Sequence, residues 1–98
     1  MDDEKFLKCV VDNNRRRILE SLGNNEKCVN DIIDDTGLEQ TLVSFHLKSL
    51  RGCGLVKTRR DGKKIMYSVS KPGILKVLNS IKQLTSEIQE DSECYECK

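Results

Sequence analysis

An Asp-Gly step near the middle of the chain constrains its fold more than any other feature. Asp61-Gly62 separates two runs with strand character, residues 55–60 and 63–69, and Gly54 precedes the first run. An Asp-Gly pair between such runs is a strong hairpin signal, because a type I′ turn needs positive φ at both central residues. The sequence therefore predicts an antiparallel hairpin over residues 55–69 with a type I′ turn at Asp61-Gly62.

Helical periodicity covers most of the remaining chain. Apolar residues recur at spacings of three and four, and glycines follow three of these runs, which indicates separate helices. The predicted helices span about residues 3–12, 15–22, 30–36, 39–51 and 71–90, with Asp2 or Asp3, Asn30 and Ser70 among their N-caps. The predicted order α-α-α-α-β-β-α describes a mainly α fold with a small β-hairpin (α+β), in a single domain over residues 1–98.

Positive charge is concentrated in one segment of the chain. The net charge is +1. Residues 48–64, however, carry seven basic side chains and one acidic side chain, Asp61. A local excess of this size is a candidate surface for binding phosphates.

Residues 30–51 fit a helix-turn-helix unit, in which two short helices meet at Gly37. Val43, Leu47 and Leu50 form the predicted buried stripe of the second helix. Its outer face then carries Gln40, Thr41, Ser44, Phe45 and Lys48. Amides and hydroxyls can read base edges in the major groove, and Phe45 can contact a thymine methyl group. The basic hairpin that follows has the position of a wing, with Arg59, Arg60, Lys63 and Lys64 available to phosphates or the minor groove.

Together these features resemble the ArsR/SmtB family of winged helix-turn-helix repressors. The residues that carry the resemblance are 43–56, 59–63 and Tyr67. Ile33 departs from the pattern, because helix-turn-helix units usually have a small residue there. The resemblance implies a homodimer on a palindromic operator in double-stranded DNA, released by an inducer, with the first and last helices forming the interface. Apolar residues of those helices are the expected interface: Phe6, Val10, Ile74, Leu78, Ile81, Leu84 and Ile88.

The sensing sites of that family are incomplete in this chain. A thiol pair at the start of the third helix would need a second cysteine where Asn30 stands, and a histidine-based site is excluded because His46 is the single histidine. Cys94-x-x-Cys97, in the acidic tail 91–98, is the remaining candidate metal site. Cys9 or Cys28 is a candidate third ligand. Arsenite, zinc or another thiophilic ion would be the inducer. An oxidant acting on the thiols, or an inert tail, are the alternatives.

Other functional classes fit less well. A winged-helix module that binds protein instead of DNA is the second hypothesis. An enzyme is not expected, because no phosphate-cradling loop or acid pair is evident, and no cofactor is required. No apolar run in the chain is long enough for a membrane helix, and the chain starts with acidic residues, unlike a signal peptide. We therefore expect a cytoplasmic protein with no membrane partner. An odd number of cysteines without an export signal predicts reduced thiols.

Overall fold

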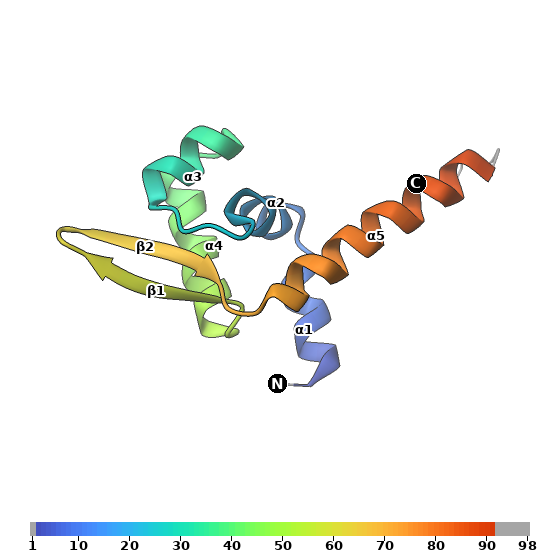
Figure 1. The fold of residues 1–98 in the computed structure, drawn as a ribbon, viewed down its shortest axis with the longest axis horizontal. Coiled ribbons are helices and arrows are strands. Elements are labelled where there is room, and N and C mark those ends of the chain that lie inside the picture. The colour runs from blue at the N-terminus through green and yellow to red at the C-terminus, as the bar shows by residue number, and fades with distance from the viewer. Residues whose placement is uncertain (1, 92–98) are drawn as a thin grey trace.

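The computed structural model describes residues 2–91 and has the predicted order of elements (Figure 1). The elements are α1 (Asp3–Val10), α2 (Asn13–Leu22), α3 (Val29–Thr36), α4 (Gln40–Gly52), β1 (Val56–Asp61), β2 (Lys64–Val69) and α5 (Pro72–Asp91). The predicted fold class, a winged helix-turn-helix with mainly α structure and one hairpin, is confirmed.

Aspartate side chains cap the first two helices. Asp2 accepts a hydrogen bond from the backbone N–H of Lys5 at 2.8 Å and so caps α1. Asp12 accepts from Asn14 and Arg15, which starts α2 two residues earlier than the sequence suggested. The predicted cap Asn30 lies inside α3, whose cap position is Cys28.

Ser70 also differs from its predicted capping role. Its hydroxyl donates a 2.7 Å hydrogen bond to the carbonyl oxygen of Gly54. Its backbone N–H donates to the carbonyl oxygen of Leu55 at 2.9 Å. Ser70 therefore joins the end of β2 to the loop that precedes β1.

The hairpin is antiparallel, with Val56 opposite Val69 and Asp61 opposite Lys64. Its turn is formed by Gly62 and Lys63, one residue later than predicted. In residues 2–91, positive φ is confined to glycines, and Gly62 has φ +64°. The type I′ assignment was therefore wrong, because positive φ at the first central residue alone is the pattern of a type II′ turn.

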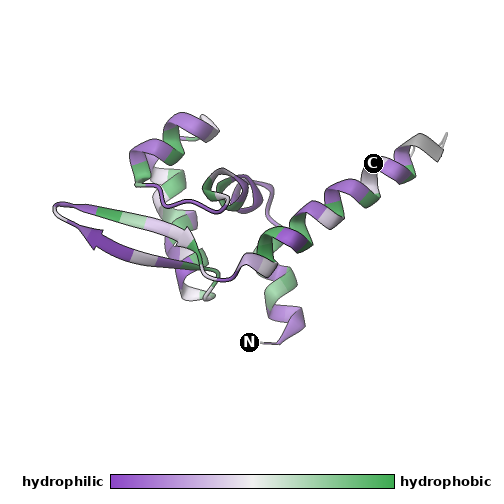
Figure 2. Cartoon of the chain, in the orientation of Figure 1, coloured by the Kyte–Doolittle hydropathy of each residue, from purple (hydrophilic) through white to green (hydrophobic). Residues whose placement is uncertain are grey.

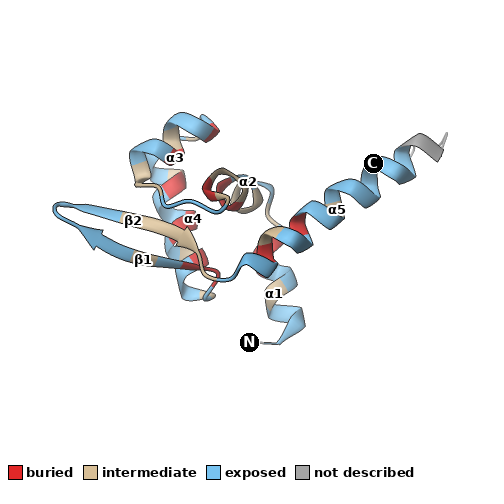
Figure 3. Cartoon of the chain, in the orientation of Figure 1, coloured by how far each residue is buried: buried red, intermediate tan, exposed pale blue. Residues whose placement is uncertain are grey.

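The core lies among the four N-terminal helices and the bases of the hairpin and α5 (Figure 3). Aliphatic side chains fill it, as the scarcity of aromatic residues requires. Those below 2% exposure are Ile18, Leu19, Leu22, Ile32, Val43, Leu47 and Leu50, and Leu78 of α5 is 2% exposed.

α5 packs on the body of the protomer through its first half alone. Ile74 and Leu78 are buried, and Lys82 forms an ion pair with Glu20 of α2 at 3.3 Å. Beyond this point α5 projects away from the other elements (Figure 1), and apolar residues continue along it between hydrophilic ones (Figure 2). Within residues 2–91, no helix has the length and apolar character needed to cross a membrane.

Candidate nucleic-acid interface

The turn between α3 and α4 is fixed by local hydrogen bonds. Gly37 ends α3 in the left-handed conformation, with φ +75°, and its N–H bonds to the carbonyl oxygen of Ile33 at 2.8 Å. The Thr36 hydroxyl donates to the carbonyl oxygen of Ile32 and accepts from the N–H of Leu38. Leu38 in turn packs against the core. The start of α4 therefore has a defined direction relative to α3.

The two faces of α4 divide as the sequence predicted. Val43, Leu47 and Leu50 are buried, with exposures of 0 to 1%. The residues predicted on the outer face, Gln40, Thr41, Ser44, Phe45 and Lys48, are all exposed. Phe45 is 58% exposed, which places a large apolar ring on an otherwise polar surface. This arrangement leaves the predicted reading face free to contact a ligand.

The basic residues of the hairpin fall into two groups. Arg60, Lys63 and Lys64 are exposed at or next to the turn. Arg59 instead pairs with Glu26, whose carboxylate lies 2.7 Å from Nη2 and 2.9 Å from Nε of Arg59. The hydrogen bonds from Arg59 lower the pKa of Glu26, and Glu26 in return raises the pKa of Arg59. Of the four predicted wing contacts, Arg59 is thus already engaged within the protein.

One groove joins the reading helix to the wing. It has a volume of about 300 Å³ and lies between the start of α3, the outer face of α4 and β2. Its lining comprises Cys28, Val29, Asn30, Gln40, Ser44, Lys64, Ile65 and Tyr67. The structure therefore brings Gln40 and Ser44 of α4 to the same face as Lys64 of the wing.

His46 links α4 to the start of α2. The side chain is 5% exposed, and its Nδ1 accepts a 3.4 Å hydrogen bond from Nε of Arg15. Its Nε2 lies 3.9 Å from a carboxylate oxygen of Asp12. Burial raises the pKa of Asp12, but hydrogen bonds from the Arg15 and Asn14 N–H groups outweigh it, so the pKa is lowered overall. His46 is therefore packed between α4 and the start of α2.

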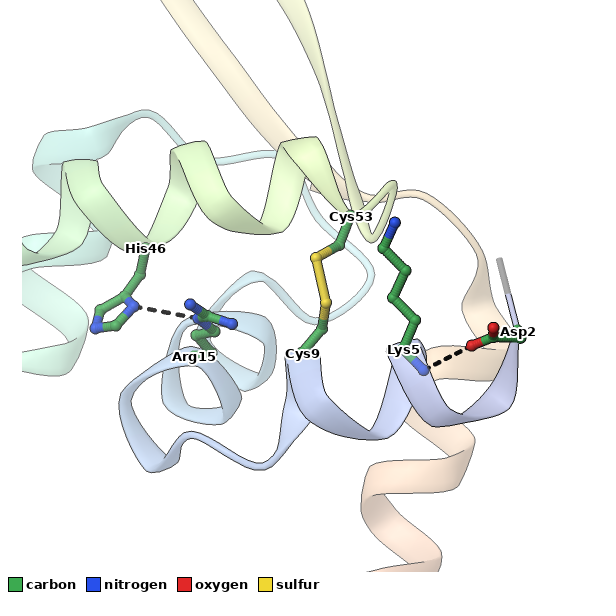
Figure 4. Close-up of a disulfide and its surroundings, with 6 residues drawn as sticks. All are labelled: Asp2, Lys5, Cys9, Arg15, His46 and Cys53. Carbon is green, nitrogen blue, oxygen red and sulfur yellow. Dashed lines mark hydrogen bonds between the residues drawn. A yellow bond between two sulfur atoms is a disulfide. The ribbon is translucent and has the colours of Figure 1, made fainter.

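A disulfide joins Cys9 of α1 to Cys53, the residue that follows α4 (Figure 4). The prediction that all thiols are reduced was therefore wrong for this pair, which is 44 residues apart in sequence. Cys9 is 4% exposed and Cys53 is half-buried, because α1 lies against the end of α4. Cys9 is consequently not a free ligand for a metal at the tail.

Of the remaining candidate metal ligands, Cys28 alone lies within the described residues. Cys28 has a free thiol, with Sγ 3.4 Å from a carboxylate oxygen of Asp31. Cys94 and Cys97 lie outside the described residues. Within residues 2–91, no group of three or more His, Cys, Asp or Glu side chains is arranged to hold a metal ion.

Part of the predicted dimer surface belongs to the core of the protomer. Val10, Ile74 and Leu78 are only 2 to 7% exposed. The apolar stripe of α5 serves two surfaces, and its first half packs on the protomer itself. Periodicity alone does not distinguish a stripe that packs internally from one that meets a second chain.

The rest of that predicted surface is accessible to different degrees. Phe6 and Ile81 are half-buried, whereas Leu84 and Ile88 are 57% and 55% exposed. Three further apolar side chains, on α1, its C-cap and α5, are exposed: Leu7, Val11 and Val77. An open hollow on α5 is lined by Lys76, Val77, Ser80, Ile81 and Leu84. The apolar surface available to a partner therefore lies along α5 from Val77 to Ile88 and at α1 with its C-cap.

Sequence reasoning missed two residues that join the hairpin to the helical body. Lys27 and Tyr67 form an isolated antiparallel bridge, with N···O distances of 3.0 and 2.8 Å. Glu26, next to Lys27, holds Arg59. In the sequence, Glu26 and Lys27 are adjacent residues of a polar turn, and this pattern does not identify the residues that they contact.

Comparison with protein families gives a match to one model. The model described as "Bacterial regulatory protein, arsR family" matches residues 12–58, which include the helix-turn-helix and the start of the wing. The arsenical resistance operon repressor of Staphylococcus aureus is 33% identical over 95% of this chain and 86% of its own length. The family and the matched repressor are transcriptional regulators, which confirms the prediction that this chain is not an enzyme.

Two other relatives are more similar over a shorter stretch. The nodulation protein NolR of Rhizobium meliloti is 38% identical over 81% of this chain. The probable mercury resistance operon repressor of Streptomyces lividans is 36% identical over 71% of it. The matched regions span 65% and 56% of the lengths of these relatives.

Among solved structures, one similar fold is a homodimeric winged helix-turn-helix DNA-binding domain, Mb0332 of Mycobacterium bovis, described as a possible ArsR-family regulator. Its TM-score is 0.79 at 25% identity, over 94% of this chain and 85% of that one.

Proposed function

Because the chain belongs to the arsR family of bacterial regulatory proteins, we propose that it is a repressor that binds specific sequences in double-stranded DNA. The observation that carries the proposal is the groove shared by α4 and the wing, where Gln40 and Ser44 face the same side as Lys64. A helix in the major groove and a basic hairpin on the adjacent backbone need this arrangement.

The two parts of the interface have different tasks in this proposal. The polar and aromatic side chains of α4 read bases: Gln40, Thr41, Ser44 and Phe45. Lys48, Arg60, Lys63 and Lys64 contact phosphates, and their charge supplies sequence-independent affinity. Arg59 belongs to the wing but is held by Glu26.

Dimerisation follows from the exposed apolar surface of α1 and α5. Leu84 and Ile88 lie on the half of α5 that projects from the protomer, and Val11, the C-cap of α1, is 75% exposed. A homodimeric assembly of the similar Mb0332 domain supports a dimer here. A two-fold dimer presents two copies of α4, so the proposed operator is palindromic.

The proposed inducer is a thiophilic ion such as arsenite or zinc, bound by Cys94 and Cys97. Repressors of arsenical and mercury resistance operons among the relatives support this class of inducer. Two thiols are fewer than the four protein ligands of a structural zinc site, so other thiols, such as Cys28, or those of a second subunit would have to supply the rest. Repression and release should be compared between the parent and a Cys94→Ser/Cys97→Ser variant with arsenite, Zn²⁺ and Cd²⁺. Equal responses of both proteins would exclude the tail as the sensor.

A second candidate function is a repressor that responds to the redox state of its thiols. The observation in its favour is the Cys9–Cys53 disulfide, which ties a helix of the proposed dimer surface to the end of α4. A small-molecule disulfide would oxidise the two thiols to this bond and leave as two thiols, and a dithiol would reverse the reaction. Operator affinity that changes between reduced and oxidised parent, but not in Cys9→Ser, would favour this function.

Salt dependence distinguishes DNA binding from the alternative of a protein-binding module. A duplex selected by the protein from a random-sequence pool should bind with an affinity that falls steeply as salt rises. A scrambled duplex should bind more weakly with a similar slope. Failure to select any sequence, together with affinity for DNA that is insensitive to salt, would contradict the proposal.

A further inference from the structure

The wing is fastened to the helical body at two consecutive residues of the loop between α2 and α3. The backbone of Lys27 pairs with Tyr67 on β2 through two hydrogen bonds, of 3.0 and 2.8 Å. The carboxylate of Glu26 accepts hydrogen bonds from Arg59 on β1. Each strand of the hairpin is therefore held by a separate contact.

The Glu26–Arg59 pair has the geometry of a clamp. Both Nε and Nη2 of Arg59 point at the carboxylate, so the guanidinium plane is oriented as well as attracted. The side chains come from positions 33 residues apart. Lys27 is itself held by Asp35 of α3, with Nζ 3.0 Å from the carboxylate. The loop between α2 and α3 therefore contacts both the wing and the helix-turn-helix.

The Glu26–Arg59 pair helps to set the distance between the wing and α4. Lys64 and Ile65 of β2 face Gln40 and Ser44 of α4 across the groove of about 300 Å³. When a helix occupies the major groove and the hairpin lies beyond the neighbouring backbone, a DNA strand passes between them. The width of the groove then determines whether both parts contact DNA together.

We propose that Glu26 and Arg59 are positioning residues for DNA binding, which hold the wing at the separation from α4 that DNA requires. The inference rests on the proposed function. In this role Arg59 is not a phosphate contact, unlike Arg60, Lys63 and Lys64. Glu26, an acidic residue beside a basic wing, then favours DNA binding instead of opposing it.

The sign of one substitution separates this role from plain electrostatics. If Glu26 merely repels DNA and withholds Arg59 from a phosphate, Glu26→Gln strengthens binding. If the pair positions the wing, Glu26→Gln weakens binding, because ordering a freely moving hairpin on DNA costs conformational entropy although its phosphate contacts stay the same. We expect a loss of about two- to fivefold in affinity for the selected duplex, the range for one well-oriented surface ion pair.

The experiment measures binding of Glu26→Gln, Arg59→Gln and the exchanged pair Glu26→Arg/Arg59→Glu to the selected and scrambled duplexes over a range of salt. Both single variants should weaken binding and leave the salt slope unchanged, whereas loss of a phosphate contact lowers the slope by about 1. The exchanged pair should recover most of the affinity. Arg60→Gln is the matched control for a phosphate contact, and Glu4→Gln is the control for loss of an exposed carboxylate far from the wing.

Amide hydrogen exchange of the free protein provides a readout that needs no DNA. The β1 and β2 amides should exchange faster in Glu26→Gln and Arg59→Gln, with α2 and α4 unchanged. Stronger DNA binding by Glu26→Gln, or hairpin exchange identical to the parent, would overturn the inference. A parent that binds no DNA but shows the exchange effect would refute the proposed function and leave the clamp in place.

Discussion

Loss of the Cys9–Cys53 bond should destabilise the protomer by several kcal/mol. The disulfide closes a loop with a sequence separation of 44 residues. In the chain-entropy model, a bond over such a loop lowers the entropy of the unfolded chain and so stabilises the folded protein by about 4 kcal/mol. This figure lies between the values for loops of about 15 and about 100 residues. The loop contains α2, α3 and α4 and therefore most of the core.

Urea unfolding of parent and Cys9→Ser, each with and without a dithiol reductant, measures this contribution. With a denaturant slope of about 1–2 kcal/mol per molar, reduction should lower the parent midpoint by about 2–4 M. Cys28→Ser is the control and should behave like the parent, because its thiol is free. Protein concentration must be fixed, since a dimer gains stability by mass action. A parent midpoint that does not move on reduction, with the bond verified by mass spectrometry, would refute this reasoning.

Three further outcomes are expected. Ser44→Ala should reduce affinity for the selected duplex by about 1–3 kcal/mol and for scrambled DNA little, whereas Lys64→Ala should weaken both, as measured by fluorescence anisotropy. Leu84→Asp should give monomers in analytical ultracentrifugation, because it places a charge on the exposed stripe of α5; a dimer at micromolar concentration would contradict this. The hydrogen bonds from Arg59 lower the pKa of Glu26 below its ordinary value of 4.5. The ion pair therefore stabilises the hairpin fully above pH 4.5, and this stabilisation disappears as the pH falls through the lowered pKa. Hairpin amide exchange, corrected for the intrinsic pH dependence, should therefore rise in acid in the parent and change less in Glu26→Gln.

Local chemistry explains what was predictable from the sequence. The order of the elements and the location of the hairpin follow from periodicity and turn residues, which act over a few positions. The division of α4 into a buried and an exposed face was predictable for the same reason, since Val43, Leu47 and Leu50 recur at helical spacing.

Features that depend on the meeting of distant segments were not predictable. The turn shifted by one residue because the pairing of Asp61 with Lys64 is set by the register of the whole hairpin. Cys9 and Cys53 are paired through the packing of α1, and nothing in their local sequence indicates it. Ile74 and Leu78 belong to the same stripe as Leu84, and only the position of α2 decides which of them are covered.

The unpaired edge of β1 has a consequence for solubility. β1 and β2 form a two-stranded sheet, and Lys27 bridges to the β2 side, so the outer edge of β1 has no strand beside it in residues 2–91. Such an edge can template pairing with another chain, and charged side chains are the usual protection. Lys57, Arg59 and Arg60 stand on this strand. We therefore expect variants that remove several of these cations from β1 to precipitate more readily than the parent.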